Sequence, residues 1–447
     1  MKTLSRASRV VGLMVSLACL PLTAHGAMGN LATTYGVLPS DVASAQALSL
    51  FNGQVSATYY NPAYLASDDR GELTGALLHG DHDLRAAAGT SNGFQVRQGE
   101  TLLDEPTQHT IIGMKTNLTS LTKFERPLYL GFVAGVEKYG SEMLAFESRT
   151  SLEGQYLTYG REPLFLNLGG ALSPIDGLML GGSARITLHS EAELVAQTDL
   201  AGNTQYESLN VSAKPSIRPV LGAAADLATL FCDSEDCLLD GVELAFSFRG
   251  YSNTKTSVSA NTVIPGTIPS PGLTIALTTL DSYQPDIFTF GAQYKRDRWR
   301  VGVALEKQNW SDLEDELTRD TIKDQANLRF DDIIIPRIGA EWEFHEGMFL
   351  TGGVALQKSP LDSIQSLDVN YLDTDKTIIG LGAALELQDP YILAYPVRLE
   401  FGYQYQQLDE RDFQLTTTDT SNPSNPYATV SAEGEVHVFS GSLTLKF

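Results

Sequence analysis

The sequence lacks a long apolar run after its first segment. The apolar stretch 10–22 follows Lys2, Arg6 and Arg9 and precedes small residues around Gly26. This arrangement is typical of a secretory signal, and we expect residues 1–26 to be removed. Beyond it, no stretch approaches the roughly 20 apolar residues that a spanning helix needs. If the exported chain enters a membrane, it must form a closed β-barrel, because lipid offers the backbone no hydrogen bonds.

Cysteine is scarce, with 3 residues in 447. Cys19 lies in the signal, and a lipoprotein signal is disfavoured because Ser16 stands where leucine is usual. Cys232 and Cys237 are close in sequence, and such a pair most often forms a disulfide in an oxidising periplasm. A metal site would need further ligands, and the 7 histidines are scattered. We therefore expect a disulfide, no metal and no other cofactor.

Basic residues are also few, with 31 Lys and Arg against 54 Asp and Glu. The formal net charge is −23, and losing the three basic residues of the signal makes it more negative still. Nucleic acids bind proteins mainly through Lys and Arg contacts to phosphates. Nucleic acid is therefore excluded as a partner.

What the sequence does contain is period-2 alternation over stretches of about ten residues, the length of a tilted transmembrane strand. In residues 397–406, Val397, Leu399 and Phe401 alternate with Arg398 and Glu400. The segments 242–249 and 299–306 repeat the pattern. One face is expected to meet lipid and the other the lumen.

Fourteen segments fit this pattern, and long connections alternate strictly with short ones, as extracellular loops and periplasmic turns do. The segments are 72–79, 110–117, 128–137, 164–172, 178–188, 217–227, 242–251, 287–295, 299–306, 337–344, 348–357, 378–387, 397–406 and 436–447. The last ends in an aromatic residue, Phe447, as outer-membrane barrels do, and we expect the barrel-assembly machinery to recognise it. The sequence therefore predicts an all-β fold, a 14-stranded antiparallel transmembrane β-barrel over residues 71–447.

Residues 27–70 precede the first strand and are too apolar to be a disordered tail. They include a helix-compatible stretch, 40–51, with Ser40 or Asp41 as a suitable N-cap. We expect this segment to fold back into the lumen as a plug, here called the hatch.

Several short motifs, taken in order, resemble the FadL/TodX family of outer-membrane transporters for long-chain fatty acids and hydrocarbons. They are Tyr60-Asn61-Pro62-Ala63, the segment 285–294, Arg298-Trp299-Arg300, Asn309-Trp310-Ser311, the segment 352–360 and Asp373-Thr374-Asp375-Lys376. Lys376 departs from the arginine more often found there. The resemblance implies that hydrophobic molecules are collected at the extracellular loops and held in a lumen pocket above the hatch. They would leave sideways through a distorted strand, driven by their own gradient.

Within the hatch motif, Asn61 could bond lumen backbone while Pro62 forces a sharp turn. Among inward-facing cations, Arg185, Arg218, Arg249 and Arg398 are the ligand-binding candidates, with Lys295 beside them. An anionic headgroup would need one, since an unpaired carboxylate is costly in a partly dry lumen. The alternative is that these cations pair with lumen acids such as Asp226, Glu243, Glu341 and Glu400. Several inward cations in so acidic a chain favour a fatty acid ligand.

Two further segments carry hypotheses. Gly131 and Gly135 lie in the third strand, where the family has its lateral kink, and strand glycines mark bulges or close approaches. The long connection 252–284 is unusually apolar, which suggests ligand capture, contact with lipopolysaccharide, or a self-packed loop cap.

The pentapeptide 89–93 matches G-x-S-x-G, but its flanks do not predict the strand-to-helix turn of a hydrolase nucleophile. No catalytic residue is expected. The sequence as a whole predicts passive uptake of hydrophobic compounds across the outer membrane by a monomer. The alternative is a structural or adhesive barrel, or a polar-solute porin.

Overall fold

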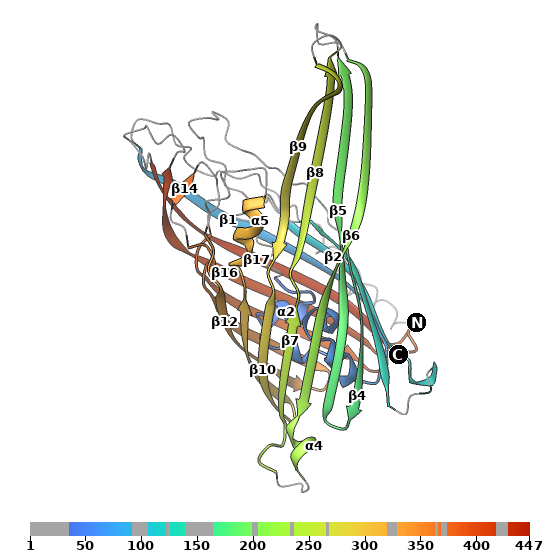
Figure 1. Ribbon diagram of the computed structural model, residues 1–447. Coiled ribbons are helices and arrows are strands. Elements are labelled where there is room, and N and C mark those ends of the chain that lie inside the picture. The colour runs from blue at the N-terminus through green and yellow to red at the C-terminus, as the bar shows by residue number, and fades with distance from the viewer. Residues whose placement is uncertain are drawn as a thin grey trace, which may run out of the picture.

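The computed structural model describes residues 35–91, 106–121, 123, 126–138, 164–198, 204–232, 237–264, 268–319, 329–362, 365–367, 373–416 and 428–447. Fourteen of its strands form one closed antiparallel barrel (Figure 1). The first strand, β1, pairs with the last, β17, along its whole length. Gly71 and Phe447 complete this seam by exchanging two backbone hydrogen bonds of 2.7 and 2.9 Å. The predicted fold class is confirmed.

Each of the fourteen predicted segments overlaps one barrel strand. The barrel strands are β1 (Glu72–Ser91), β2 (Thr107–Asn117), β3 (Leu128–Lys138), β4 (Leu164–Ile175), β5 (Leu178–Thr198), β6 (Thr204–Asp226), β7 (Val242–Arg249), β10 (Ile287–Arg296), β11 (Trp299–Gln308), β12 (Ile333–His345), β13 (Met348–Gln357), β15 (Lys376–Leu387), β16 (Val397–Thr416) and β17 (Ala428–Lys446). Several of them continue past the predicted limits toward the long connections. Strand pairing can extend there because it does not depend on lipid.

Four strands build an arm that rises beyond the barrel body (Figure 1). The hairpin β8 (Ser252–Ile264) and β9 (Ile268–Gln284) joins the outer parts of β5 and β6, with β8 parallel to β5. The interpretation of residues 252–284 as a loop is therefore wrong. Their many Thr and β-branched residues favour strands, and β5 offers them an edge to pair with. A short strand, β14 (Gln365–Leu367), pairs parallel with the outer part of β16.

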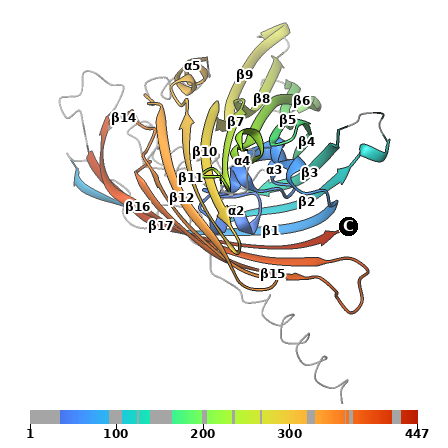
Figure 2. The same cartoon turned by 90° about the horizontal axis from the view of Figure 1, so that it is seen from below.

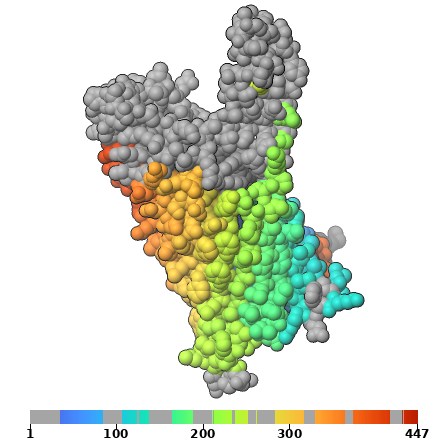
Figure 3. Space-filling view, in the orientation of Figure 1, coloured from blue at the N-terminus to red at the C-terminus, as the bar shows by residue number. Residues whose placement is uncertain are grey.

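The alternation of buried and exposed residues follows the prediction. Along β2, residues from Thr107 to Lys115 alternate strictly, with Ile112 and Met114 exposed on the outer wall. On β16, Leu399 and Phe401 are exposed while Glu400 and Gln404 are buried inside. The wall is thus apolar outside and polar inside, and neighbouring strands close it on the face shown in Figure 3. No helix among the described residues is long and apolar enough to cross a membrane.

The described part of the hatch, residues 35–70, lies inside the barrel (Figure 2). It contains α2 (Pro39–Ala43), η1 (Ser49–Phe51), α3 (Ala57–Tyr60) and η2 (Pro62–Ser67). The predicted helix over 40–51 is thus interrupted, because Ala45 and Gln46 adopt positive φ angles of 47° and 64°. The other short helices of the described residues lie in connections between consecutive barrel strands: η3 (Thr119–Leu121), α4 (Leu227–Phe231) and α5 (Asp312–Arg319).

Inward-facing glycines let the hatch touch the wall. At each, an added Cβ would come within 3.0 Å of a hatch atom. This glycine belt comprises Gly113, Gly131, Gly181, Gly222, Gly291, Gly302, Gly339, Gly353, Gly380, Gly382 and Gly402. These glycines lie on most strands of the barrel, so the hatch is in close van der Waals contact with the wall on nearly every side.

Candidate functional site: the hatch and the lumen around it

The Asn-Pro motif joins two hatch segments and sits against the wall. The Asn61 side chain donates to the carbonyl of Leu50 at 3.0 Å and accepts from the N–H of Ala63 at 3.3 Å. It also lies 3.5 Å from the carbonyl of Ala223 on β6. Pro62 begins η2, where its missing N–H leaves no bond unmade. The motif thus acts mainly as a brace within the hatch, with a weaker bond to lumen backbone.

Asp41 is the polar centre of the hatch. Its buried carboxylate accepts hydrogen bonds from the Ser49 hydroxyl at 2.7 Å, the Leu38 N–H at 3.0 Å and the Asn52 amide at 3.3 Å. Burial raises the pKa of Asp41 from 3.8 to about 6, although these hydrogen bonds oppose the shift. No sequence pattern marked this residue beyond its place as a possible N-cap.

An ion-paired triad holds the hatch from the extracellular side. Glu306 on β11 contacts Arg249 on β7 at 2.5 Å and Arg337 on β12 at 3.2 Å, and all three are buried. Arg337 also donates to the carbonyl of Ala45 at 2.8 Å. A cavity of about 30 Å³ lies beside the triad and is lined largely by polar side chains, among them Gln46. The triad therefore contacts the hatch at Ala45 and Gln46, the two residues with positive φ angles.

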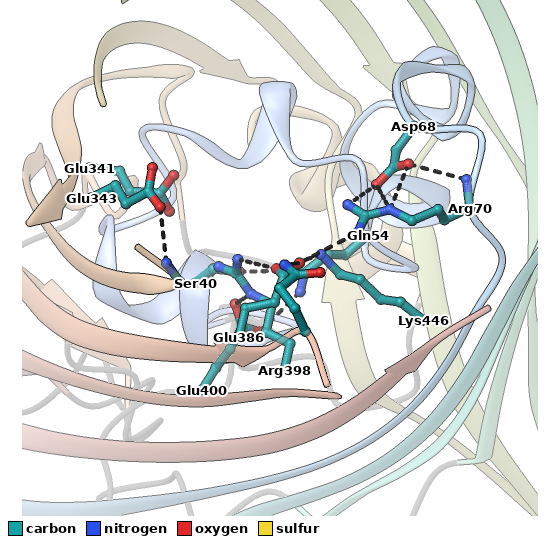
Figure 4. A network of polar contacts seen from close by, with 12 residues as sticks. Ser40, Gln54, Asp68, Arg70, Glu341, Glu343, Glu386, Arg398, Glu400 and Lys446 are labelled. Atoms are coloured by element: carbon teal, nitrogen blue, oxygen red, sulfur yellow. Dashed lines mark hydrogen bonds and ion pairs between the residues drawn. The ribbon is translucent and has the colours of Figure 1, made fainter. Parts of the chain in front are cut away.

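A larger cavity of about 630 Å³ opens on the other side of the hatch and is lined mainly by polar and charged residues. Figure 4 shows the network on its wall. Arg398 contacts Glu400 at 2.7 Å, Lys446 contacts Glu386 at 2.8 Å, and the hatch residue Gln54 donates to Glu400 at 3.1 Å. On the neighbouring strands β11 and β12, Arg300 pairs with Glu341 at 2.9 Å. An apolar molecule would find no favourable path through this charged space.

The four predicted ligand-binding arginines lie inside the barrel but contact protein groups. Arg185 lies 4.6 Å from the ring of Phe165 and 5.3 Å from that of Tyr59, and Arg218 lies 4.1 Å from the Tyr251 ring. Arg249 and Arg398 form the ion pairs described above. Lys295 is exposed at the edge of the larger cavity.

The expected pairing of lumen cations with lumen acids is found for two of the four acids. Glu341 and Glu400 pair with arginines, while Glu243 accepts from the Tyr64 hydroxyl and from Gln293, and Asp226 caps α4. Sequence reasoning missed Glu306 and Arg337 as a site. Both occupy inward positions of the alternation, which is the signal that could have flagged them.

Strand β3 pairs continuously with β2 and β4. Its two candidate glycines make close approaches. Gly131 leaves room for Thr58 and Leu65 of the hatch, and Gly135 for the ring of Phe165. The close-approach interpretation therefore accounts for both glycines, and their role in a lateral opening stays a prediction.

The remaining motifs fall as follows. Cys232 and Cys237 are joined in the turn between β6 and β7, as predicted. Of the G-x-S-x-G match, residues 89–91 lie within β1, whereas a nucleophile elbow places its serine at a strand-to-helix turn. Asn92 and Gly93 lie outside the described residues. The expected signal lies within residues 1–34, which are also outside them. Ser359 meets the late acidic motif, donating its hydroxyl to Asp373 and its N–H to Asp375, both at 2.8 Å. Lys376 pairs with Asp373 at 3.0 Å.

Comparisons with known proteins agree with this architecture. The chain is 50% identical over 447 residues to alkane uptake protein A of Marinobacter nauticus, covering 98% of this chain and 96% of that protein. Its fold is similar to a Pseudomonas aeruginosa FadL homologue, with a TM-score of 0.61, 15% identity, and 93% and 99% of the two chains covered. It is also similar to the Pseudomonas putida toluene transporter TodX, with a TM-score of 0.55, 13% identity and the same coverage. No family model matches the sequence.

The closed barrel, its apolar outer wall and the hatch in its lumen define an outer-membrane β-barrel with a plugged lumen. The chain belongs to the FadL/TodX family of outer-membrane proteins, together with alkane uptake protein A.

Proposed function

We propose that this protein takes up alkanes, or similarly uncharged hydrocarbons, by passive movement across the outer membrane. The observation that carries the proposal is that the candidate lumen arginines are engaged by carboxylates or aromatic rings. A fatty acid would have to break such contacts to pair its carboxylate, whereas an alkane makes no such demand. The name of the M. nauticus relative, alkane uptake protein A, supports the same ligand class. This favours a hydrocarbon over the fatty acid that the inward cations suggested.

Capture is proposed to occur on the extracellular arm. The backbone of the arm is a four-stranded sheet in which β8 pairs with β5 and β9 pairs with β8. The sequence of its β8 and β9 segment, residues 252–284, is rich in Val, Ile and Leu and contains only two charged residues, Lys255 and Asp281. A segment of this composition suits contact with hydrocarbon, while lipopolysaccharide is a second apolar partner it could meet.

Exit is proposed to be sideways into the membrane. The charged cavity below the hatch offers no favourable site to an alkane, whereas the outer leaflet of lipid beside the wall does. The third strand, with Gly131 and Gly135, remains the candidate for the opening. Small residues there would let the strand separate from the hatch with little side-chain rearrangement.

The remaining assignments complete the proposal. Residues 1–26 would be the signal, 27–70 the hatch and 71–447 the barrel. The protein would act as a monomer, with no enzymatic activity and no cofactor, and the assembly machinery would recognise Phe447. The alternative functions are a polar-solute porin and a structural or adhesive barrel. A porin needs an open lumen, whereas the hatch lies inside this barrel.

The test compares an alkane with the fatty acid of equal length. We expect Arg185→Gln, Arg218→Gln, Arg249→Gln and Arg398→Gln to leave the ratio of alkane uptake to fatty acid uptake unchanged. Using the ratio cancels any loss of folded protein. A selective loss of fatty acid uptake in one variant by roughly tenfold or more, the worth of a charge-assisted hydrogen bond, would instead identify a bound carboxylate.

A further inference from the structure

The turn between β15 and β16, residues 388–396, presents a run of exposed apolar residues. Tyr391 is 102% exposed and Ile392 90%, and Leu393 and Tyr395 are each about half exposed. No charged residue lies between Asp389 and Arg398. Pro390 and Pro396 bracket the run and restrict its backbone. Apolar residues so concentrated in a short turn point to an apolar partner.

This surface is continuous with the outer wall of the barrel. The Tyr395 ring packs edge-on against the ring of Phe447 at 6.3 Å between centroids. Phe447, Leu387 and Leu399 are exposed on the outside of the neighbouring strands. The N–H of Lys446 donates to the carbonyl of Pro396 at 2.9 Å and ties the base of the turn to β17. Figure 2 shows this turn near the C-terminus, at the end of the barrel that carries the short turns.

We propose that residues 391–395 insert into the headgroup interface of the periplasmic leaflet and anchor the barrel beside its closing seam. The outer wall faces lipid, so the turn extends a surface that already contacts the membrane. Tyrosine suits this depth because its ring is apolar and its hydroxyl can stay hydrated. Interfacial aromatic residues help set the depth and tilt of a membrane protein. Because the turn carries no basic residue, its insertion depends on apolar burial and not on anionic lipids.

A fluorescent label at residue 392 tests the proposal. The full protein carrying Ile392→Cys is labelled without reductant, so that Cys232 and Cys237 stay paired, and is placed in phosphatidylcholine vesicles. Glu346→Cys is the matched control, since Glu346 is exposed in the adjacent short turn between β12 and β13. Brominated acyl chains should quench the label at 392 at least twofold more than the label at 346, and aqueous iodide should do the reverse. Heat-modifiable gel migration confirms that both variants are folded.

The outcomes separate the possible occupants. Quenching that is the same at low and high salt supports insertion by apolar burial. The proposal is overturned if iodide quenches the label at 392 as strongly as the label at 346, because the turn would then lie in water. A surface that binds a periplasmic protein would give this result, since the vesicles contain no such protein. Quenching that disappears when the protein is diluted in the bilayer also overturns it, since that result indicates contact between two copies.

Discussion

Asp41 makes the stability of the hatch depend on pH. For an acid whose pKa is raised by folding, the folded state holds its proton more tightly than the unfolded state, so stability falls as pH rises from about 4 to about 6. The two pKa values, 3.8 and about 6, imply a loss of roughly 3 kcal/mol above pH 6. Hydrogen exchange of hatch amides, corrected for intrinsic rates, should show protection decreasing over this range.

The Asp41→Asn variant is the control for this dependence. Its amide keeps one acceptor oxygen for Ser49 but cannot ionise, so the loss of hatch protection between pH 4 and 6 should be absent. An equal pH slope in the variant and the parent protein would assign the dependence to another group.

Ala45 carries backbone strain beside the Arg337 contact. Its φ of 47° lies in the left-handed region, where a non-glycine residue is disfavoured by roughly 1–2 kcal/mol. Ala45→Gly should therefore stabilise the docked hatch or leave it unchanged. Ala47→Gly, two residues on and not among the positive-φ residues, should destabilise it by about 1 kcal/mol. Hatch protection by hydrogen exchange compares the two, and equal losses would show that the strain at Ala45 carries no energy.

At the scale of elements, the glycine belt fixes the distance between strands and hatch. A Cβ at Gly353 on β13 would come within 2.0 Å of the carbonyl oxygen of Ser44. Gly353→Ala should therefore push the hatch out of place, at a cost of roughly 1–3 kcal/mol, and raise the frequency of channel openings in planar bilayers. The adjacent Gly352 is the matched control, because its added Cβ would meet Leu381 at an ordinary 3.4 Å. If Gly352→Ala opens the channel equally, strand stability and not hatch contact is responsible.

The arm and the barrel strands differ in what holds them. Barrel strands pair on both sides, so their register is set by two neighbours as well as by the lipid-facing pattern. Among the strands that the structure describes, β9 pairs with β8 alone, which leaves its other edge without a described partner. Alternation was readable in the barrel strands, whereas the parallel pairing of β8 with β5 had no local signal.

At the scale of the whole molecule, we expect the hatch to decide whether the barrel conducts ions. Hatch residues pack against most strands of the barrel, so the intact protein should show little ion conductance. Deleting residues 27–65 should remove this obstruction and produce a stable channel in planar bilayers. An intact protein that conducts steadily, as a porin does, would contradict the transporter assignment. Asn61→Ala serves as the control: it removes the hydrogen bond to Leu50 but deletes no part of the hatch, so we expect it not to produce a stable channel.

The amino-acid sequence by itself determined the strands, their inward and outward faces and the hatch motif. These depend on local periodicity and on the requirement that lipid meet apolar side chains and no free backbone groups. Only the tertiary structure decided which charges pair. Glu306 on β11 joins Arg249 and Arg337 because β7, β10, β11 and β12 follow one another around the barrel wall and the three side chains meet inside it. Asp41 becomes the centre of the hatch because the chain folds around it. Local alternation places a residue inside the barrel, but its partners there depend on how the whole ring closes.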